Sequence, residues 1–462
     1  MLELKTPKEK AANAGTLAKS FEMVRYRSTT YIPAHYETGS TEFPPPPEET
    51  MWVPLSRDDV QQLAARQFDM LFGTDSELAG FDFMVAQNCI RHDTPATTLL
   101  VRTAEGLKSL DEMGKLQEVT GDFVPNTLTP MLNEDQAKKD ECFAVISEWV
   151  GGDEEAESLL THLATTLAPG WSAVKYVLLL GEGRNGKSVL LKMLHKLLGA
   201  HNVSSVTRQA IAEKSPAVLD LNGKLLNLVY DGQAEYLKDS GAEKTLIAGE
   251  PFGIRRLYES TATPVQTNAL FVEALQREPK SVDKSTALQK RLVRFLFPNV
   301  YPMDHAFERK MVSEEMLGAF MSLLIDRFVL EDEVAEKLAP TSRTVELQLE
   351  HMYINSIALQ FLGYYEENDT MGTAGLAGKP MAEVVQAFQS WRIKENDLGN
   401  WAEPDVMVQL APLLHTTRKT ARVDGKPRKV RVVEGLKPEA QAFIDSLKGE
   451  EDDPIAAAVV DD

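Results

Sequence analysis

The segment from Gly181 to Ser188 constrains this chain more than any other part of its sequence. It reads Gly-Glu-Gly-Arg-Asn-Gly-Lys-Ser, which fits the pattern of a phosphate-binding loop in full. The apolar run Val177–Leu180 precedes it and predicts a strand buried on both faces. The residues after it, Ser188–Leu198, have apolar positions at helical spacing and are followed by Gly199. A strand, a glycine-rich turn and a helix in this order predict a P-loop.

The residue types of this loop suit a bound nucleotide. Its glycines let successive backbone N–H groups converge on a phosphate, and the helix N-terminus adds partial positive charge. We expect Lys187 to contact the β- and γ-phosphates of ATP and Ser188 to bind Mg²⁺. The other nucleotide-binding candidates are Gly181, Glu182, Gly183, Arg184, Asn185 and Gly186. The alternative is a glycine-rich turn with a solvated lysine.

Residues 170–300 alternate strand-like and helical patterns, which predicts an α/β fold. Further strands are expected at Leu225–Tyr230, Thr263–Asn268 and Leu292–Phe297. Asp231 follows the first of these, so we expect its carboxylate to face the nucleotide and bind Mg²⁺. Glu235 is the candidate that polarises the attacking water. The alternatives are a turn aspartate and a surface glutamate.

Separate signatures between Phe123 and Pro298 resemble the superfamily 3 helicases, in particular the poxvirus and phage primase–helicase type. The segments that carry the resemblance are Pro125–Pro130, Asn185–Ser188, Lys244–Tyr258 with Glu250 in place of Asp, Gln266–Asn268 and Asp283–Leu292. The resemblance implies an AAA+ P-loop ATPase core with an N-terminal helical collar region. It also implies a homo-oligomeric, hexameric ring around DNA.

The resemblance also assigns roles to single residues. Asn268 would be the polar sensor, although the loop beyond it is long and makes Gln276 a second candidate. Arg291 would be the arginine finger that reaches the ATP of the neighbouring subunit. The residues that would contact DNA phosphates along the channel are Lys244, Arg255 and Arg256. The alternatives are a turn asparagine, a surface arginine and a solvated basic face.

A second basic element follows near the C-terminus. The segment His415–Val433 predicts a helix end and then a hairpin that turns at Asp424-Gly425. Its candidate DNA-binding residues are Arg418, Lys419, Arg422, Lys426, Arg428, Lys429 and Arg431. After helices, a basic hairpin is typical of the wing of a winged-helix-like module. The alternative is a solvated hairpin with no role in DNA binding.

Composition and pattern, together with what the resemblance implies, predict five segments. They are an irregular arm (1–50), a mixed and helical collar domain (51–168), an AAA+ ATPase domain (169–335), a C-terminal helical and winged-helix domain (336–447) and an acidic disordered tail (448–462). The stretch before the collar is too short for a primase domain and has no cysteine–histidine cluster. We therefore expect the helicase portion without a primase domain, with any primase or polymerase on a separate chain.

The chain carries 49 Lys and Arg against 69 Asp and Glu, a net charge of −20. That average repels nucleic acid, so contacts with single-stranded or forked DNA must be local. No apolar stretch approaches the roughly 20 residues that span a bilayer, and we expect a cytoplasmic protein with no membrane partner. The expected function is ATP-dependent DNA unwinding by a translocating ring in viral or phage DNA replication. The alternative is another P-loop NTPase, such as a DNA packaging or loader ATPase without unwinding activity.

Overall fold

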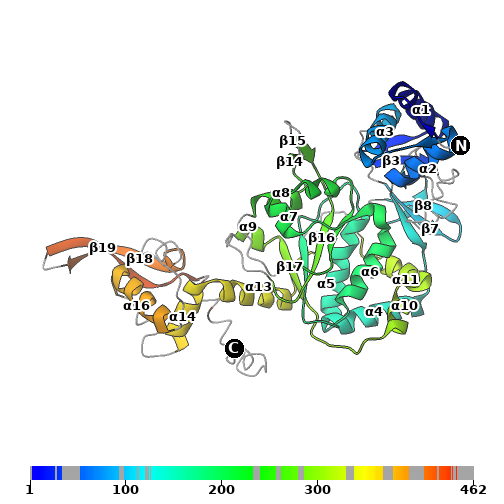
Figure 1. Cartoon of the computed structure of the whole chain (residues 1–462). Coiled ribbons are helices and arrows are strands. Elements are labelled where there is room, and N and C mark those ends of the chain that lie inside the picture. Colours follow the sequence, from blue (N-terminus) through cyan, green and yellow to red (C-terminus); the bar gives the residue numbers. More distant parts are fainter. Residues whose placement is uncertain are drawn as a thin grey trace. The chain divides into compact units, whose positions relative to one another are not determined.

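The computed structural model describes residues 3–26, 29–33, 52–92, 98–111, 114–119, 124, 126–232, 240–255, 262–278, 286–328, 338–367, 378–394, 410–423, 426–438, 440 and 444. The chain divides into two compact units, Met1–Val345 and Glu346–Asp462, which are described one after the other. Both units combine helices with strands, so the predicted α/β class is confirmed (Figure 1).

The beginning of the chain folds into helices and strands. A sheet with the order β4-β3-β2-β6 packs with three helices, and β1 pairs with β5. The strands are β1 (Glu3–Leu4), β2 (Val24–Tyr26), β3 (Thr29–Pro33), β4 (Trp52–Leu55), β5 (Met70–Leu71) and β6 (Ile90–His92), and the helices are α1 (Pro7–Ser20), α2 (Arg57–Phe68) and α3 (Asp75–Asn88). The predicted irregular arm is therefore wrong for the described part of residues 1–50. The proline run 44–47 lies outside the described residues.

Local signals explain helix α1. The Thr6 hydroxyl accepts a hydrogen bond from the Glu9 N–H at 3.4 Å, and the Glu9 carboxylate accepts one from the Thr6 N–H at 2.8 Å. This reciprocal capping box satisfies two donors that a helix start otherwise leaves unpaired. The helix then buries Ala14, Leu17 and Ala18 against its neighbours. An alanine-rich segment that looks irregular in isolation is thus held by its cap and its packing.

The helical region before the glycine-rich loop is confirmed. A second sheet with the order β10-β7-β8-β9 leads into it. Its strands are β7 (Leu99–Thr103), β8 (Gly106–Leu110), β9 (Leu116–Glu118) and β10 (Thr127–Met131), and the helices that follow are α4 (Gln136–Val150) and α5 (Asp153–Ala164). Later in the chain, α10 (His305–Met311) and α11 (Glu314–Ile325) join the same layer, since α11 packs on α4, α5 and β10.

A five-stranded parallel sheet forms the centre of the first unit, with the order β12-β13-β16-β11-β17. Its strands are β11 (Tyr176–Leu180), β12 (Val203–Ser204), β13 (Leu226–Val229), β16 (Leu270–Leu275) and β17 (Leu292–Leu296). Helix α6 (Lys187–Leu198) follows β11 directly. The shorter helices α7 (Arg208–Ala212), α8 (Gly241–Ile247) and α9 (Thr286–Gln289) lie on the opposite face of the sheet from α5 and α6 (Figure 1).

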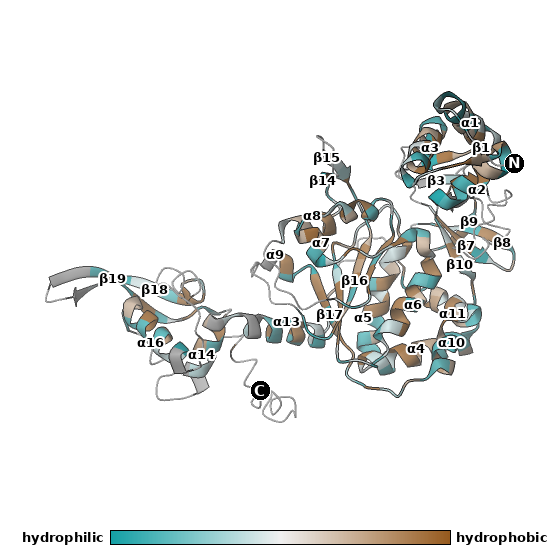
Figure 2. Ribbon diagram, in the orientation of Figure 1, coloured by the Kyte–Doolittle hydropathy of each residue, from teal (hydrophilic) through white to brown (hydrophobic). Residues whose placement is uncertain are grey.

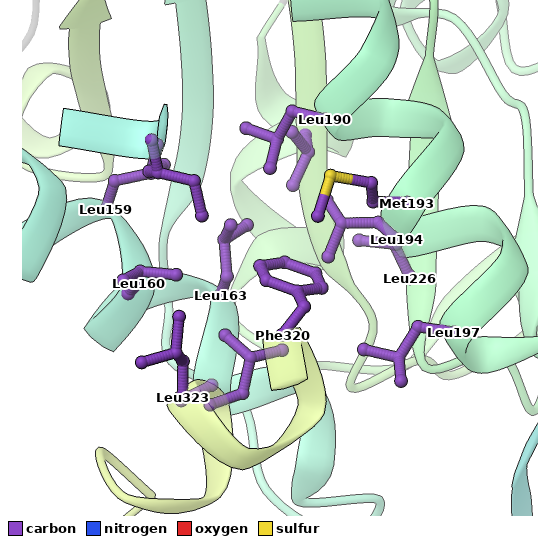
Figure 3. Close-up of a cluster of buried hydrophobic side chains, with 14 of the residues drawn as sticks. Leu159, Leu160, Leu163, Leu190, Met193, Leu194, Leu197, Leu226, Phe320 and Leu323 are labelled. Carbon is purple, nitrogen blue, oxygen red and sulfur yellow. The ribbon is translucent and has the colours of Figure 1, made fainter. Parts of the chain in front are cut away.

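Both faces of this sheet are buried, which makes a helix–sheet–helix sandwich. One core joins the sheet to α4, α5, α6 and α11, and Figure 3 shows Leu163, Leu190 and Phe320 meeting there. The other core joins the sheet to α7, α8 and α9. Hydrophobic residues accordingly follow the central strands (Figure 2). Continuous apolar runs such as Val177–Leu180 are what a strand covered on both faces requires.

One predicted strand is wrong. Residues Thr263–Asn268 were expected to form a buried strand that Asn268 closes. Instead β15 (Ala262–Val265) pairs antiparallel with β14 (Phe252–Arg255) in a hairpin, and the buried parallel strand β16 begins only at Leu270. Asn268 therefore lies before a sheet strand and not at the end of one. The alternating exposure of β15 fits a strand with one solvated side.

The second unit contains helices and one long hairpin. Its elements are α13 (Ser342–Asn355), which spans the boundary between the units, α14 (Ile357–Glu367), α16 (Met381–Lys394), β18 (Leu414–Val423) and β19 (Lys426–Leu436). Ser356 separates α13 from α14. Phe361, Phe388 and Trp391 form the aromatic centre of the core. The acidic tail 448–462 lies outside the described residues.

None of the helices in the described ranges combines the length and the apolar character that crossing a bilayer requires.

Candidate nucleotide site

The loop between β11 and α6 has a backbone that requires glycine at both ends. Gly181 and Gly186 have φ angles of +141° and +93°. A β-carbon on Gly186 would lie 2.6 Å from the ring of Trp149, and one on Gly181 would lie 2.6 Å from the Phe297 carbonyl oxygen. Neither position therefore accepts a side chain without a shift of its neighbours. The predicted strand, turn and helix around this loop are confirmed.

Lys187 begins α6 and its ammonium group lies inside the loop. The side chain is 7% exposed, and Nζ donates hydrogen bonds to the Glu182 carbonyl oxygen and to Asn185 Oδ1, both at 3.0 Å. It also donates to the Gly181 carbonyl oxygen. Burial lowers the pKa of Lys187 to about 8, and the charge of Asp231 opposes that shift. The Lys187 ammonium group is thus partly removed from water and bonded to oxygens of the glycine-rich loop. A bound phosphate would take the place of these oxygens as its partner.

Asp231 lies at the same edge of the sheet as the glycine-rich loop. It comes just after β13, and the next N–H, that of Gly232, donates to the Ala274 carbonyl oxygen of β16 at 2.8 Å. Its carboxylate is exposed, and so is Ser188 in the first turn of α6. These side chains can reach a shared ligand at the carboxyl ends of parallel strands. Glu235 lies outside the described residues.

The sensor position needs a correction. Strand β16 runs parallel to β11, with Phe271 beside Tyr176 and Leu275 beside Leu180. Asn268 precedes β16 and therefore lies at the edge opposite the glycine-rich loop, where its side chain approaches Gly249. Its assignment as the sensor is wrong for this geometry. The second candidate, Gln276, directly follows β16 and is exposed at the same edge as the loop.

Arg291 also lies near the amino ends of the parallel strands, at the edge of the sheet opposite the glycine-rich loop. It precedes β17, and its carbonyl oxygen accepts a hydrogen bond from the Tyr176 N–H at 2.8 Å. Tyr176 is the first residue of β11, and the loop that holds Lys187 follows the last one. The five residues of the strand span roughly 16 Å between them. Arg291 therefore does not lie beside the Lys187 of its own chain.

The predicted DNA-binding residues of the first unit are divided between a helix and a hairpin. Lys244 is half-buried in the last turn of α8, and Arg255 is exposed at the outer end of β14. The β14–β15 hairpin projects from the body of this unit (Figure 1). Arg256 and the rest of the hairpin tip lie outside the described residues. Arg255 thus belongs to the projecting hairpin, and Lys244 belongs to the helix that precedes it.

The long hairpin of the second unit is confirmed, since β18 and β19 pair antiparallel up to Val423 and Lys426. The predicted turn residues, Asp424 and Gly425, lie outside the described residues. Arg418 lies directly opposite Arg431, so both side chains point to one face. The exposed basic residues are Arg418, Lys419, Lys429 and Arg431, and Lys419 forms an ion pair with Glu434 at 3.4 Å. Arg422, Lys426 and Arg428 belong to the same strands, but their side chains lie outside the described set.

A buried polar network beneath the site was missed by sequence reasoning. Tyr176 donates to Glu273 at 3.0 Å, and the Arg208 guanidinium lies 5.4 Å from the centre of the Tyr176 ring. Arg208 also forms an ion pair with Glu243 at 2.7 Å, in which each side chain is 4% exposed. A β-carbon on Gly232 would lie 2.2 Å from Glu273 Oε1. The network therefore extends from the turn after Asp231 to helix α8.

The charged groups on this face of the sheet have partners inside the fold. Burial raises the pKa of Glu273 to about 7, and the nearby Arg208 opposes the shift. On the same face, the fully buried Arg294 forms two hydrogen bonds with the Glu278 carboxylate, at 2.6 and 2.9 Å, and a third with Gln289 at 2.7 Å. The available signal was a charged residue inside an apolar strand, Glu273 in β16 and Arg294 in β17.

Within the described ranges, no group of three or more His, Cys, Asp or Glu side chains forms a ready metal site. The oxygen donors that could hold a divalent cation together with a phosphate are the Ser188 hydroxyl and the Asp231 carboxylate. A hydroxyl and a carboxylate suit Mg²⁺, which usually keeps several waters and binds few protein groups.

No family model matches the sequence, and neither does any curated protein. Among solved structures, two described as apo forms of the "NrS-1 C terminal region" are similar to the chain, each with 12% sequence identity. One has a TM-score of 0.49 over 92% of this chain and 98% of that chain. The other has a TM-score of 0.48 over 93% of this chain and 100% of that chain. Likeness at this level carries no conclusion about function.

Proposed function

We propose that this chain is an ATP-dependent DNA helicase that acts as a homo-oligomeric ring in viral or phage DNA replication. Its first unit would be an AAA+ ATPase with ATP and Mg²⁺ as cofactors, working in the cytoplasm of the host cell. The substrate would be single-stranded or forked DNA.

One observation carries the proposal: the ends of three parallel strands bring the required groups to one edge of the sheet. Lys187 and Ser188 follow β11, Gln276 follows β16 and Asp231 follows β13. Lys187 would neutralise the β- and γ-phosphates, while Ser188 and Asp231 would hold Mg²⁺. Gln276 would orient the attacking water or contact the γ-phosphate, because its strand lies between the other two.

The position of Arg291 supports a site that two subunits share. It lies at the sheet edge opposite Lys187, away from the glycine-rich loop of its own chain. Its side chain would therefore act on a nucleotide bound by another protomer. A guanidinium from a neighbour would stabilise the charge that develops on the γ-phosphoryl oxygens. Hydrolysis would then depend on assembly, which is what a ring motor requires.

Two exposed basic hairpins support the choice of DNA as the substrate. The β14–β15 hairpin, with Arg255, projects from the ATPase unit and would contact a strand in the channel. The β18–β19 hairpin would be the wing of a winged-helix-like module that also contains α14 and α16. Backbone phosphates need only local cations, so an acidic average charge is compatible with such contacts.

The test is strand separation on a forked DNA, with and without ATP, beside a Lys187→Ala control. We expect unwinding by the wild-type protein that requires ATP and is lost in the variant. Moving the single-stranded tail from one strand to the other would give the polarity. DNA-stimulated ATP hydrolysis without any strand separation would contradict the helicase proposal and favour a packaging or loader ATPase.

A further inference from the structure

A segment beside the glycine-rich loop takes no part in the site described above. We call residues 297–303, which follow β17, the strap. The Phe297 carbonyl oxygen accepts a hydrogen bond from Asn185 Nδ2 at 3.2 Å, and the Tyr301 N–H donates to the Arg184 carbonyl oxygen at 2.7 Å. The strap is therefore tied at two points to the loop that would hold the phosphates.

Helix α4 fixes the strap from its other side. Asn299 Nδ2 donates to the Glu148 carbonyl oxygen at 2.8 Å, and the Tyr301 hydroxyl donates to the same oxygen at 3.3 Å. The Tyr301 ring is half-buried and packs against the main hydrophobic core. These bonds hold residues 297–301 of the strap beside the loop, and Met303 follows two residues later.

The strap exposes two large aliphatic side chains. Val300 is 63% exposed and Met303 is 68% exposed, more than any other large apolar side chain in the part of the chain that the structure describes. Val300 directly precedes the residue that bonds to Arg184. A single exposed aliphatic residue is ordinary, whereas two within four positions of one segment beside a candidate binding loop offer a small apolar surface, called here the platform.

We propose that Val300 and Met303 form the base-binding part of the nucleotide site, on which the adenine ring of ATP packs. This inference rests on the proposed function, because it needs the triphosphate in the glycine-rich loop. Nucleotide pockets combine a few polar groups for the charged part of a ligand with apolar walls for its ring. Methionine suits such a wall, since its flexible thioether adapts to an aromatic face.

The size of the platform favours a base over a second protein chain. Stable protein interfaces bury areas far larger than two side chains can cover. The hydrogen bond between Tyr301 and Arg184 also joins the platform to the phosphate loop directly. Because the two side chains offer contact area and no hydrogen-bonding groups, the platform discriminates weakly between purine bases. GTP should bind with nearly the affinity of ATP.

The test compares two ligands on the full chain in the presence of Mg²⁺: ATP, and inorganic tripolyphosphate, which has no base. In the double variant Val300→Thr, Met303→Gln, we expect the Kd for ATP to rise about tenfold and the Kd for tripolyphosphate to stay within about twofold of wild type. The control is Ile90→Thr, because Ile90 in β6 is also exposed, at 62%, and its variant should bind both ligands normally.

Each other outcome overturns the inference in a distinguishable way. Unchanged ATP affinity in the double variant would refute the role of Val300 and Met303 in binding the base, and it would leave the proposed function intact. Equal weakening of ATP and tripolyphosphate means that the strap only supports the loop. Dissociation of an oligomer with unchanged ATP affinity assigns the two side chains to a contact between copies. Failure of the wild-type protein to bind either ligand refutes the proposed function itself.

Discussion

The affinity of the protein for ATP should fall as the pH rises above 8, because of Lys187. Burial lowers the pKa of this ammonium group to about 8 in the free protein, against an ordinary value of 10.5. A bound triphosphate adds several negative charges beside it and restores a high pKa. Binding at alkaline pH therefore requires the uptake of a proton, which the free protein loses progressively as the pH passes 8.

The size of the effect follows from that pKa. About 10% of Lys187 is neutral at pH 7 and about 90% at pH 9, if the group titrates alone. The Kd for Mg²⁺-ATP should therefore rise about tenfold between pH 7 and pH 9, which is about 1.4 kcal/mol of binding free energy. Asp231 belongs to the same local field and raises the pKa of Lys187, so Asp231→Asn should move the onset of the loss to lower pH.

Isothermal calorimetry with a non-hydrolysable ATP analogue measures this directly. Titrations at pH 7, 8 and 9 and constant ionic strength give the Kd profile, and two buffers of different ionisation enthalpy give the number of protons taken up. Lys187→Met is the control, since it should bind weakly with a flat profile. A wild-type Kd that is equal at pH 7 and pH 9 would refute the reasoning, and so would a methionine variant with the wild-type slope.

Three further predictions concern catalysis and stability. Arg291→Ala should keep ATP binding but lower turnover by about 10³-fold, and mixing it with Lys187→Ala subunits should restore part of the activity; a fully active variant would contradict a shared site. Glu243→Gln should destabilise the first unit by roughly 3–5 kcal/mol in urea unfolding, because Arg208 stays buried without its carboxylate. Gly318→Ala should lower the melting temperature, since its β-carbon would lie 2.2 Å from the Met131 carbonyl oxygen; an unchanged value would mean that α11 moves freely against β10.

The candidate site was predictable where its signals are local. The loop from Gly181 to Ser188 needs only its own glycines and the strand and helix on either side. Asp231 was predictable because the strand before it is a short apolar run with a polar residue at its end. The long β18–β19 hairpin was predictable from Asp424-Gly425 between alternating strands.

The parts that failed depend on partners far away in the sequence. Strands β2 and β3 have three and five residues and are stabilised by β4 and β6, whose positions the sequence of residues 24–33 does not reveal. The prediction for Asn268 failed because a hairpin strand, β15, and a sheet strand, β16, follow one another within a few residues. Propensity cannot decide which of the two joins the parallel sheet.

The burial of the charged residues was not predictable, although a charge inside an apolar run was a local signal. A glutamate in β16 and an arginine in β17 look like solvent-facing positions of half-exposed strands, yet Glu273 is 2% exposed and Arg294 is fully buried. Their partners Tyr176 and Glu278 come from other segments that only the tertiary fold brings together. Such groups are tolerated inside because each one has a hydrogen-bonded partner.

Lys187 and Arg291 lie at opposite edges of one sheet, and this gives every protomer two unlike faces. A contact that joins the Arg291 edge of one protomer to the Lys187 edge of the next is heterologous, so it propagates until it closes on itself or continues as a filament. An open line of such contacts always leaves the Lys187 edge of one terminal protomer without an Arg291 edge beside it. A closed assembly leaves no Lys187 edge in that state. Activity per protomer should therefore rise steeply with protein concentration and become constant once closure is complete.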